Sequence, residues 1–170
     1  MSKDVLQAIR PEWCEKIISG KKTMEVRKNR PNQETPFKVY IYCTIGKKTL
    51  YRSSYDGVIR LYHKAAPEAF SHHQVLNGKV IGEYVCRYLV PLSVSVSGEE
   101  ALDPPIEIPG LGITDLELWK YLGNGKEGQG WGISELKIYE RPLELKKLGV
   151  FTPPQSWRYV EERGDRRGIF

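Results

Sequence analysis

The chain has 170 residues, and 26 Lys and Arg residues against 21 Asp and Glu residues give it a formal net charge of +5. A chain of this length can bury one core, and no apolar run approaches the roughly 20 residues that span a bilayer, which excludes a membrane-spanning class. The first residues lack the pattern of a signal peptide. We therefore expect a single cytoplasmic domain over residues 1–162, followed by a mobile tail over residues 163–170, where charge and glycine mix.

Cysteine and histidine do not form the pattern of a metal or cofactor site. The cysteines are odd in number, far apart in the sequence and set among apolar neighbours: Cys14, Cys43 and Cys86. We interpret them as reduced core residues. No zinc-type spacing occurs, and the three histidines lack nearby Cys or acidic ligands. The sequence therefore predicts no metal, no cofactor and no disulfide-linked partner.

The chain begins with a predicted strand and a short helix. Residues 5–9 are expected to form the strand. Pro11 suits the first position of a helix, and Trp13 lies four residues before Ile17 on an apolar stripe. Gly20 suits the left-handed residue that ends a helix. On this pattern we interpret Trp13 as a core residue.

After Gly20 the pattern changes to a period of two, which is typical of a strand. Met24 and Val26 point to one side, while Thr23, Glu25 and Arg27 point to the other. We expect Met24 and Val26 to be buried and the other three to face away from that core. The polar face aligns a hydroxyl, a carboxylate and a guanidinium.

The next predicted strand covers residues 38–45 and alternates clearly. Its apolar face includes Val39 and Ile41, and its more polar face carries Tyr40 and Tyr42, which are weak candidates for ligand contact. Residues 46–78 hold few strong patterns. Within them a short helix is expected from about residue 67 to residue 76.

The second half of the chain is predicted to be mostly extended. A long strand is expected over residues 80–89, where Gly82 marks a bulge or a close backbone approach. Three prolines exclude a central strand from residues 97–113. A Thr-Asp-Leu-Glu capping box predicts a helix over residues 115–122, and another strand is expected over residues 134–139. This order lacks regular βαβ alternation, so it favours an α+β mixed barrel.

Positive charge is concentrated in one short stretch. From Lys16 to Arg30 the sequence holds six bases and one acid, Glu25. The net charge of this stretch is therefore +5, the same as that of the whole chain. The bases are Lys16, Lys21, Lys22, Arg27, Lys28 and Arg30. A focused positive field attracts anions, above all phosphates. The alternative is a solvated face that keeps the protein soluble.

The same stretch resembles a known family. Gly20-x-Lys22-x-x-Glu25-x-Arg27 is similar to the G-x-K-x-x-E-x-R signature of ASCH domains, which belong to the PUA-like superfamily. Other segments resemble the family in the same order, and the last two resemble phage-type members: residues 9–13, 77–84, 130–136 and 153–160. The resemblance implies a PUA-like mixed β pseudo-barrel flanked by short helices.

The resemblance also implies association with nucleic acid, RNA above all. The expected partner is single-stranded RNA or DNA, or a modified nucleoside, since no helix-turn-helix element is present to read a duplex. Lys21, Lys22 and Lys28 would attract phosphate, and Arg27 can bind phosphate or a base edge through two bonds. Glu25 can accept a bond from an exocyclic amine. Further candidate binding residues are Arg10, Trp131 and Trp157.

The two tryptophans have two possible roles. Trp131 lies between two glycines, and Trp157 lies shortly after two prolines and a glutamine in the sequence. Either could line a cleft and stack a base. Either could instead close one end of the barrel.

Two other functions remain open. Some ASCH-like proteins are amidohydrolases of N4-acylated cytidine, and Lys22 matches the position of their catalytic lysine. The chain departs from that pattern, because Glu25 stands where the enzymes have threonine and Thr23 lies one residue from the lysine. If the chain is an enzyme, these three residues are the catalytic candidates. The third possibility is a non-catalytic phage interaction module, in which Glu25 and Arg27 only order the strand.

Overall fold

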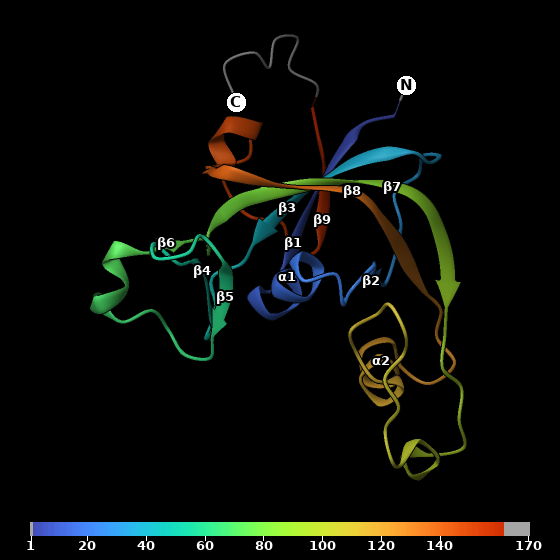
Figure 1. The fold of residues 1–170 in the computed structure, drawn as a ribbon. Helices are drawn as coiled ribbons and strands as arrows, with labels where there is room; N and C mark the ends of the chain where they lie inside the picture. The colour runs from blue at the N-terminus through green and yellow to red at the C-terminus, as the bar shows by residue number, and fades with distance from the viewer. Residues whose placement is uncertain (1, 162–170) are drawn as a thin grey trace.

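The computed structural model describes residues 2–161 and has two sheets and two short helices (Figure 1). The larger sheet has six strands in the order β2-β8-β7-β3-β1-β9, and the smaller has three in the order β5-β4-β6. The strands are β1 Asp4–Ile9, β2 Met24–Arg27, β3 Phe37–Cys43, β4 Thr49–Arg52, β5 Ile59–Tyr62, β6 Gln74–Val75, β7 Lys79–Leu92, β8 Gly128–Leu143 and β9 Trp157–Val160. The helices are α1 Pro11–Ile18 and α2 Asp115–Leu122, with 3-10 turns η1 Glu68–His72, η2 Glu99–Leu102 and η3 Leu145–Leu148.

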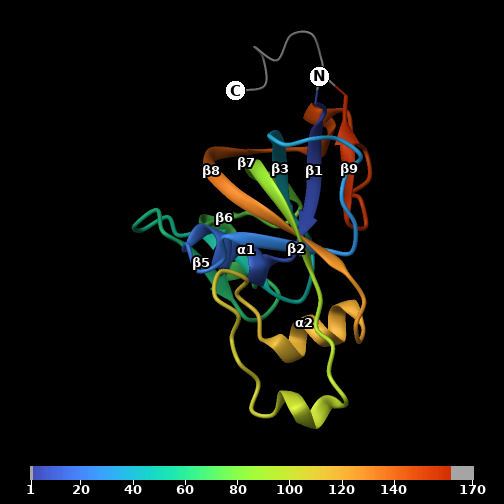
Figure 2. The ribbon, with the colours of Figure 1, turned by 90° about the vertical axis from the view of Figure 1, so that its right-hand side faces the viewer.

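The six-stranded sheet is mixed, because β1 and β3 are parallel while its other pairs are antiparallel. Its two ends come together through side chains: Arg27 of edge strand β2 donates from Nη1 to the carbonyl oxygen of Ser156, just before edge strand β9, at 3.3 Å, and Trp157 of β9 donates from Nε1 to Asn29 Oδ1 at 2.8 Å. Figure 2 shows the segment after β2 passing beside β9. The expected α+β pseudo-barrel is therefore confirmed, with closure by side-chain bonds between the edges.

Both faces of β3 are buried. Val39 and Ile41 of β3 point into the main core with α1, and all three cysteines are buried and unpaired there, as predicted. Tyr40 and Tyr42 point to the opposite face and are also buried, against the segment that contains η3. The expectation that these tyrosines lie on a polar face was wrong, because residues 145–150 cover that side.

Two local signals are confirmed in detail. The predicted helix is α2, and its capping box is complete: Glu117 N donates to Thr114 Oγ1 at 3.1 Å, and Thr114 N donates to Glu117 Oε2 at 2.7 Å. At Gly82 the register between β7 and β8 shifts. A Cβ there would lie 2.4 Å from the Lys137 carbonyl oxygen, so the strands approach closely at this glycine.

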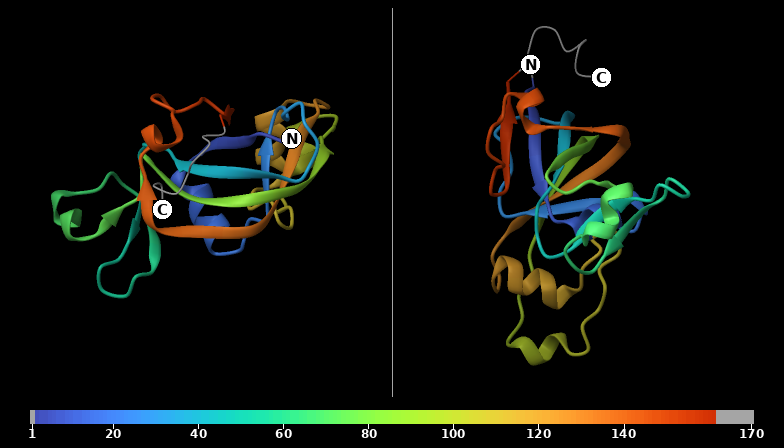
Figure 3. Two further views of the ribbon diagram at one scale, coloured as in Figure 1. Left: turned by 90° about the horizontal axis from the view of Figure 1, so that it is seen from above. Right: turned by 90° about the vertical axis from the view of Figure 1, so that its left-hand side faces the viewer.

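Residues 46–78 differ from the prediction. Instead of a helix over residues 67–76 they hold the three-stranded sheet and the turn η1. This sheet lies against α1 at one side of the barrel (Figure 3), and Leu50 and Ile59 pack into the main core. The long strands β7 and β8 extend beyond their predicted ends, whereas β3 stops at Cys43, two residues early.

Within residues 2–161 no helix is both long and apolar enough to cross a bilayer. The tail predicted to be mobile, residues 163–170, lies outside the described residues. The extent of the single domain, residues 1–162, stays a prediction.

Candidate functional site

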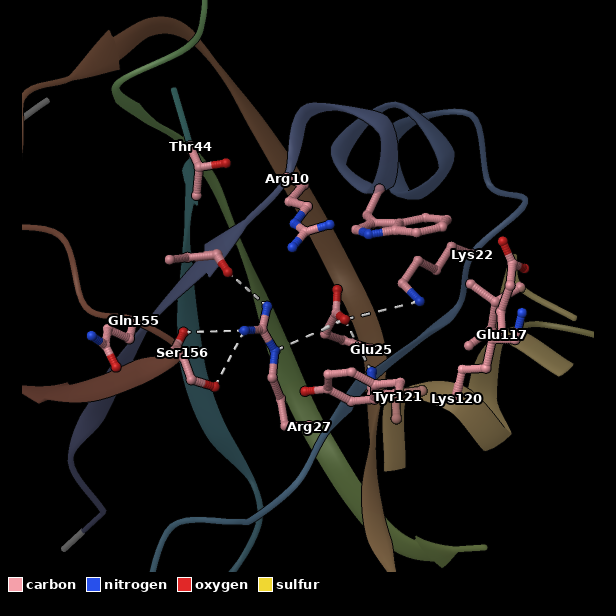
Figure 4. Close-up of a pocket in the computed structure, with 14 residues that line it drawn as sticks. Arg10, Lys22, Glu25, Arg27, Thr44, Glu117, Lys120, Tyr121, Gln155 and Ser156 are labelled. Carbon is pink, nitrogen blue, oxygen red and sulfur yellow. Dashed lines mark hydrogen bonds and ion pairs between the residues drawn. The ribbon is translucent and has the colours of Figure 1, made fainter. Parts of the chain in front are cut away.

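A cavity of about 490 Å³ opens where α1, β2 and α2 meet (Figure 4). Its floor is formed by the signature strand, and the segments before β9 and after β3 contribute Ser156 and Thr44. The cations on its wall outnumber the acids: Arg10, Lys22, Arg27 and Lys120 against Glu25 and Glu117. A positive lining around a buried carboxylate suits a ligand that carries both acceptors and a donor.

Three signature residues meet at the cavity floor. Lys22, Glu25 and Arg27 are only 3, 5 and 9 % exposed. Lys22 Nζ and Arg27 Nε each lie 3.9 Å from Glu25 Oε1. Because β2 alternates, Val26 on its other side is buried against Leu118 and its neighbours on and before α2. The predicted alternation of Glu25 and Arg27 against Val26 is confirmed, but the polar face points into the barrel and not to solvent.

Lys22 is held in place by the loop before α2. Its ammonium donates to the Leu111 carbonyl oxygen at 2.7 Å and lies 5.7 Å from the centre of the Trp13 ring. Burial lowers the pKa of Lys22; the nearby Glu25 carboxylate opposes this effect, while Arg27 lowers the pKa further. Lys22 is therefore a desolvated cation whose charge depends on its neighbours.

Glu25 has unused hydrogen-bonding capacity. Its Oε1 accepts a bond from the Val26 backbone N–H at 3.0 Å, while its buried Oε2 has no protein partner. Arg27 Nε is likewise buried and without a hydrogen bond. A buried polar atom without a partner costs about 1–3 kcal/mol, so these atoms favour a ligand or water at the cavity floor.

Arg27 fixes the strand in position. Its Nη2 donates to the Ala8 carbonyl oxygen, and its Nη1 donates to the backbone oxygen and to Oγ of Ser156, both at 3.3 Å. Both terminal nitrogens are thus engaged within the barrel. Arg27 uses these nitrogens to join the two ends of the sheet, and its two-bond contact to phosphate or a base edge stays a prediction.

Two aromatic side chains lie at the cavity wall. Trp13 is half-buried, and the Lys16 ammonium lies over its ring, 4.9 Å from the ring centre. Tyr121 is exposed, and the Lys28 ammonium lies over its ring, 5.3 Å from the ring centre. Trp13 only partly packs against the core and also lines the cavity, so its interpretation as a simple core residue was incomplete.

Comparison with solved structures identifies the architecture. An ASCH protein from Zymomonas mobilis matches with a TM-score of 0.61 at 18 % identity, over 94 % of this chain and 89 % of that one. A Tyr-to-Phe variant of that protein matches with a TM-score of 0.60 at 17 % identity, over 95 % and 92 % of the two chains. The chain has the ASCH fold. No family sequence profile and no curated protein sequence matches it. The closer resemblance to phage-type members stays a prediction.

Within this ASCH fold, the other basic candidates lie at different depths. Arg10 is exposed and lines the cavity. Lys21 and Lys28 are exposed and do not line it, although Lys28 reaches Tyr121 at the rim. Thr23 is exposed outside the cavity, and its backbone N–H donates to the Gly110 carbonyl oxygen at 2.8 Å. The structure thus brings Arg10 to the signature residues but leaves Thr23 out.

The two candidate tryptophans do not line the cavity. Trp131 is 0 % exposed and packs edge-on against Phe37 and Trp157. It therefore closes the barrel, as the alternative interpretation held, and has no free face for a base. Trp157 is half-buried and bonded to Asn29 at the closure of the sheet edges.

The cavity-lining residues that the sequence did not indicate include Thr44 and Ser156, and three of them come from α2. Glu117, Lys120 and Tyr121 line the cavity about a hundred positions after the signature. Their one sequence signal is the capping box, which placed the helix but not its face. Among residues 2–161, no group of three or more His, Cys, Asp or Glu side chains could hold a metal ion.

Proposed function

We propose that the cavity binds one nucleobase of single-stranded RNA or DNA, or a modified nucleoside. The observation that carries this proposal is the buried Glu25 carboxylate, whose Oε2 lacks a partner between two buried cations. The cavity volume of about 490 Å³ falls within the roughly 300–1,000 Å³ of small-molecule sites. A cavity of this size has room for a whole base.

The chemistry of the wall fits a base better than a plain anion. Glu25 accepts only, so it would select a donor such as an exocyclic amine. Trp13 and Tyr121 offer aromatic faces, and stacking contributes about 1–3 kcal/mol per base. Arg10 is exposed at the same cavity, where it can contact the phosphate beside the bound base.

The field outside the cavity supports a polyanionic ligand. Lys21 and Lys28 are exposed next to the signature strand, and they belong to the stretch that carries the chain's excess positive charge. Exposed lysines of this kind steer a phosphate backbone without reading its sequence. The cavity would then supply the preference for one base.

The test uses fluorescence anisotropy with labelled single-stranded oligonucleotides at several salt concentrations. Arg10→Ala should weaken binding severalfold and reduce the slope of log K against log salt by about 0.7, which is one phosphate contact on a single strand. Lys147→Ala is the matched control, because Lys147 is an exposed cation near η3 and outside the cavity. Equal effects of the two variants would remove the cavity from the binding site.

Glu25→Gln tests the carboxylate itself. The amide donates as well as accepts, so this variant should change the preference among homopolymers more than the average affinity. No binding of any oligonucleotide or nucleoside by the wild-type protein would refute the proposal and favour a non-catalytic interaction module.

Hydrolysis of N4-acylated cytidine is the second candidate. The observation in its favour is the lowered pKa of buried Lys22 beside a carboxylate. Against it, Thr23 lies outside the cavity. The assay incubates the protein with N4-acetylcytidine and follows release of acetate by chromatography. We expect no turnover; turnover that Lys22→Met abolishes would establish catalysis.

A further inference from the structure

The outer face of the small sheet carries a cluster of aromatic and histidine rings. Its members lie on β4, on β5, in the turn between them and in or beside η1: Tyr51, Tyr55, Tyr62, Phe70, His72 and His73. We call these six residues the ring cluster. The small sheet projects to one side of the barrel in both views of Figure 3, away from α2.

The register of the sheet explains why these rings face outward. Leu50 and Ile59 point inward to the main core, so their sequence neighbours point to the opposite face. Tyr51 therefore lies outward, opposite Arg60 on β5. Phe70 covers part of this face, with its ring centre 4.8 Å from that of Tyr51.

The outermost rings are not covered. Tyr55 is 83 % exposed, and His72 beside it is exposed as well. The ring centres of Tyr55 and His72 lie 5.7 Å apart, and those of His72 and His73 lie 3.9 Å apart. Core packing does not account for rings that face solvent in this way, whereas successive bases stack on aromatic platforms of this kind.

The segment that carries the ring cluster has an excess of positive charge. Residues 46–78 contain five Lys and Arg residues and two acids, in addition to the three histidines. Arg52 is bound to the carbonyl oxygens of Tyr139 and Glu140, and Arg60 to Asp56. The exposed Lys47 and Lys64 are the remaining sources of attraction for phosphate, together with Lys48, which lines a second cavity.

This second cavity connects the small sheet with the candidate site. It has a volume of about 620 Å³ between α1 and β5, and Arg60 and His63 form its small-sheet side. Trp13 and Glu117 line both cavities. The two cavities are therefore neighbours, and a strand that passes Trp13 would run along the second cavity toward the small sheet, past Lys16 and Lys48 and also past Glu12 and Glu15.

We propose that the ring cluster is a second contact for the same single strand, whose bases stack on Tyr55 and His72 while Lys64 neutralises phosphate. The inference rests on the proposed function, since the strand is taken to start at the first cavity. Single-strand sites of other proteins take roughly 4–16 nucleotides, which sets the length of strand to be tested.

The experiment compares a trinucleotide with an oligonucleotide of about 12 residues, within that range of site sizes. The Tyr55→Ala/His72→Ala variant should bind the trinucleotide like the wild type and the longer strand about tenfold more weakly. Phe151→Ala is the matched control, because Phe151 is also 83 % exposed but lies after η3. Trp13→Ala should weaken binding of both ligands.

The possible outcomes separate the two proposals. Unchanged binding of the longer strand by the double variant would overturn the second contact and leave the first cavity in place. If Trp13→Ala has no effect while the double variant loses the longer strand, the ring cluster stands and the first cavity fails. A wild-type protein that binds neither ligand refutes both.

Discussion

Replacing Arg27 with methionine tests whether one side chain closes the barrel and orders the site. Arg27 Nη2 donates to the Ala8 carbonyl oxygen at 2.8 Å, Nη1 donates to Ser156, and Nε lies 3.9 Å from Glu25 Oε1. Methionine fills much of the volume but supplies no donor and no charge. It therefore removes both the bridge between the sheet edges and one of the cations beside the buried carboxylate.

The expected loss of stability follows from these contacts. A buried acceptor left without its donor costs about 1–3 kcal/mol, and removal of one partner of a buried ion pair costs about 3–5 kcal/mol. Because Lys22 still lies 3.9 Å from Glu25, we expect a total near the lower end of the summed costs, about 4–5 kcal/mol. Glu25→Gln alone should cost about 3–5 kcal/mol as well, because it leaves buried Lys22 and Arg27 without their carboxylate.

The assay is urea denaturation, with tryptophan fluorescence as the readout of unfolding. In the Arg27→Met/Glu25→Gln double variant the carboxylate is replaced by a neutral amide, so losing Arg27 should cost less there. The free energies of unfolding lost by the two single variants should therefore add to at least about 1 kcal/mol more than the loss measured for the double variant. Arg87→Met is the control, since its 2.6 Å ion pair with Glu135 is exposed and should contribute at most about 1 kcal/mol. Strictly additive effects, or an Arg27 variant no weaker than the Arg87 variant, would refute the reasoning.

Three further predictions concern single positions. Thr114→Ala should cost about 1 kcal/mol through loss of the capping box, while Thr114→Ser should melt like the wild type; equal melting of all three would deny the cap its role. Gly82→Ala should cost about 1–3 kcal/mol because its Cβ would meet the Lys137 carbonyl oxygen at 2.4 Å, and Gly46→Ala, which has open space, should not. Burial lowers the pKa of Lys22, so its charge is lost on alkaline titration earlier than that of an exposed lysine. The affinity for an oligonucleotide of A and C should fall over the same pH range in which Lys22 loses its charge. The Lys22→Met variant should not show this fall.

Local patterns in the sequence predicted local structure well. The capping box fixed α2, and the alternation around Val26 fixed the two faces of β2. These signals depend on neighbours within one element. The candidate site depends on more: the loop that holds Lys22 through Leu111, and the helix face that presents Tyr121, follow about ninety to a hundred residues later.

The errors also have physical causes. The strands of the small sheet have only two to four residues each, too few to show a period. Trp131 lies between glycines, a pattern that also suits an exposed cleft. In the structure these glycines make room for large neighbours, since a Cβ at Gly130 would meet Met24 Sδ and one at Gly132 would meet the Tyr88 ring, each at 2.3 Å. Such contacts across a sheet cannot be read from the sequence.

The central claim is that a nucleobase occupies the cavity floor. The most direct measurement is a crystal structure of the protein with a bound single-stranded oligonucleotide. We predict one base between Trp13 and Tyr121, with an amine donating to Glu25 Oε2 and a phosphate at Arg10. An oligonucleotide that is clearly bound elsewhere, with the cavity floor holding only water, would contradict the claim.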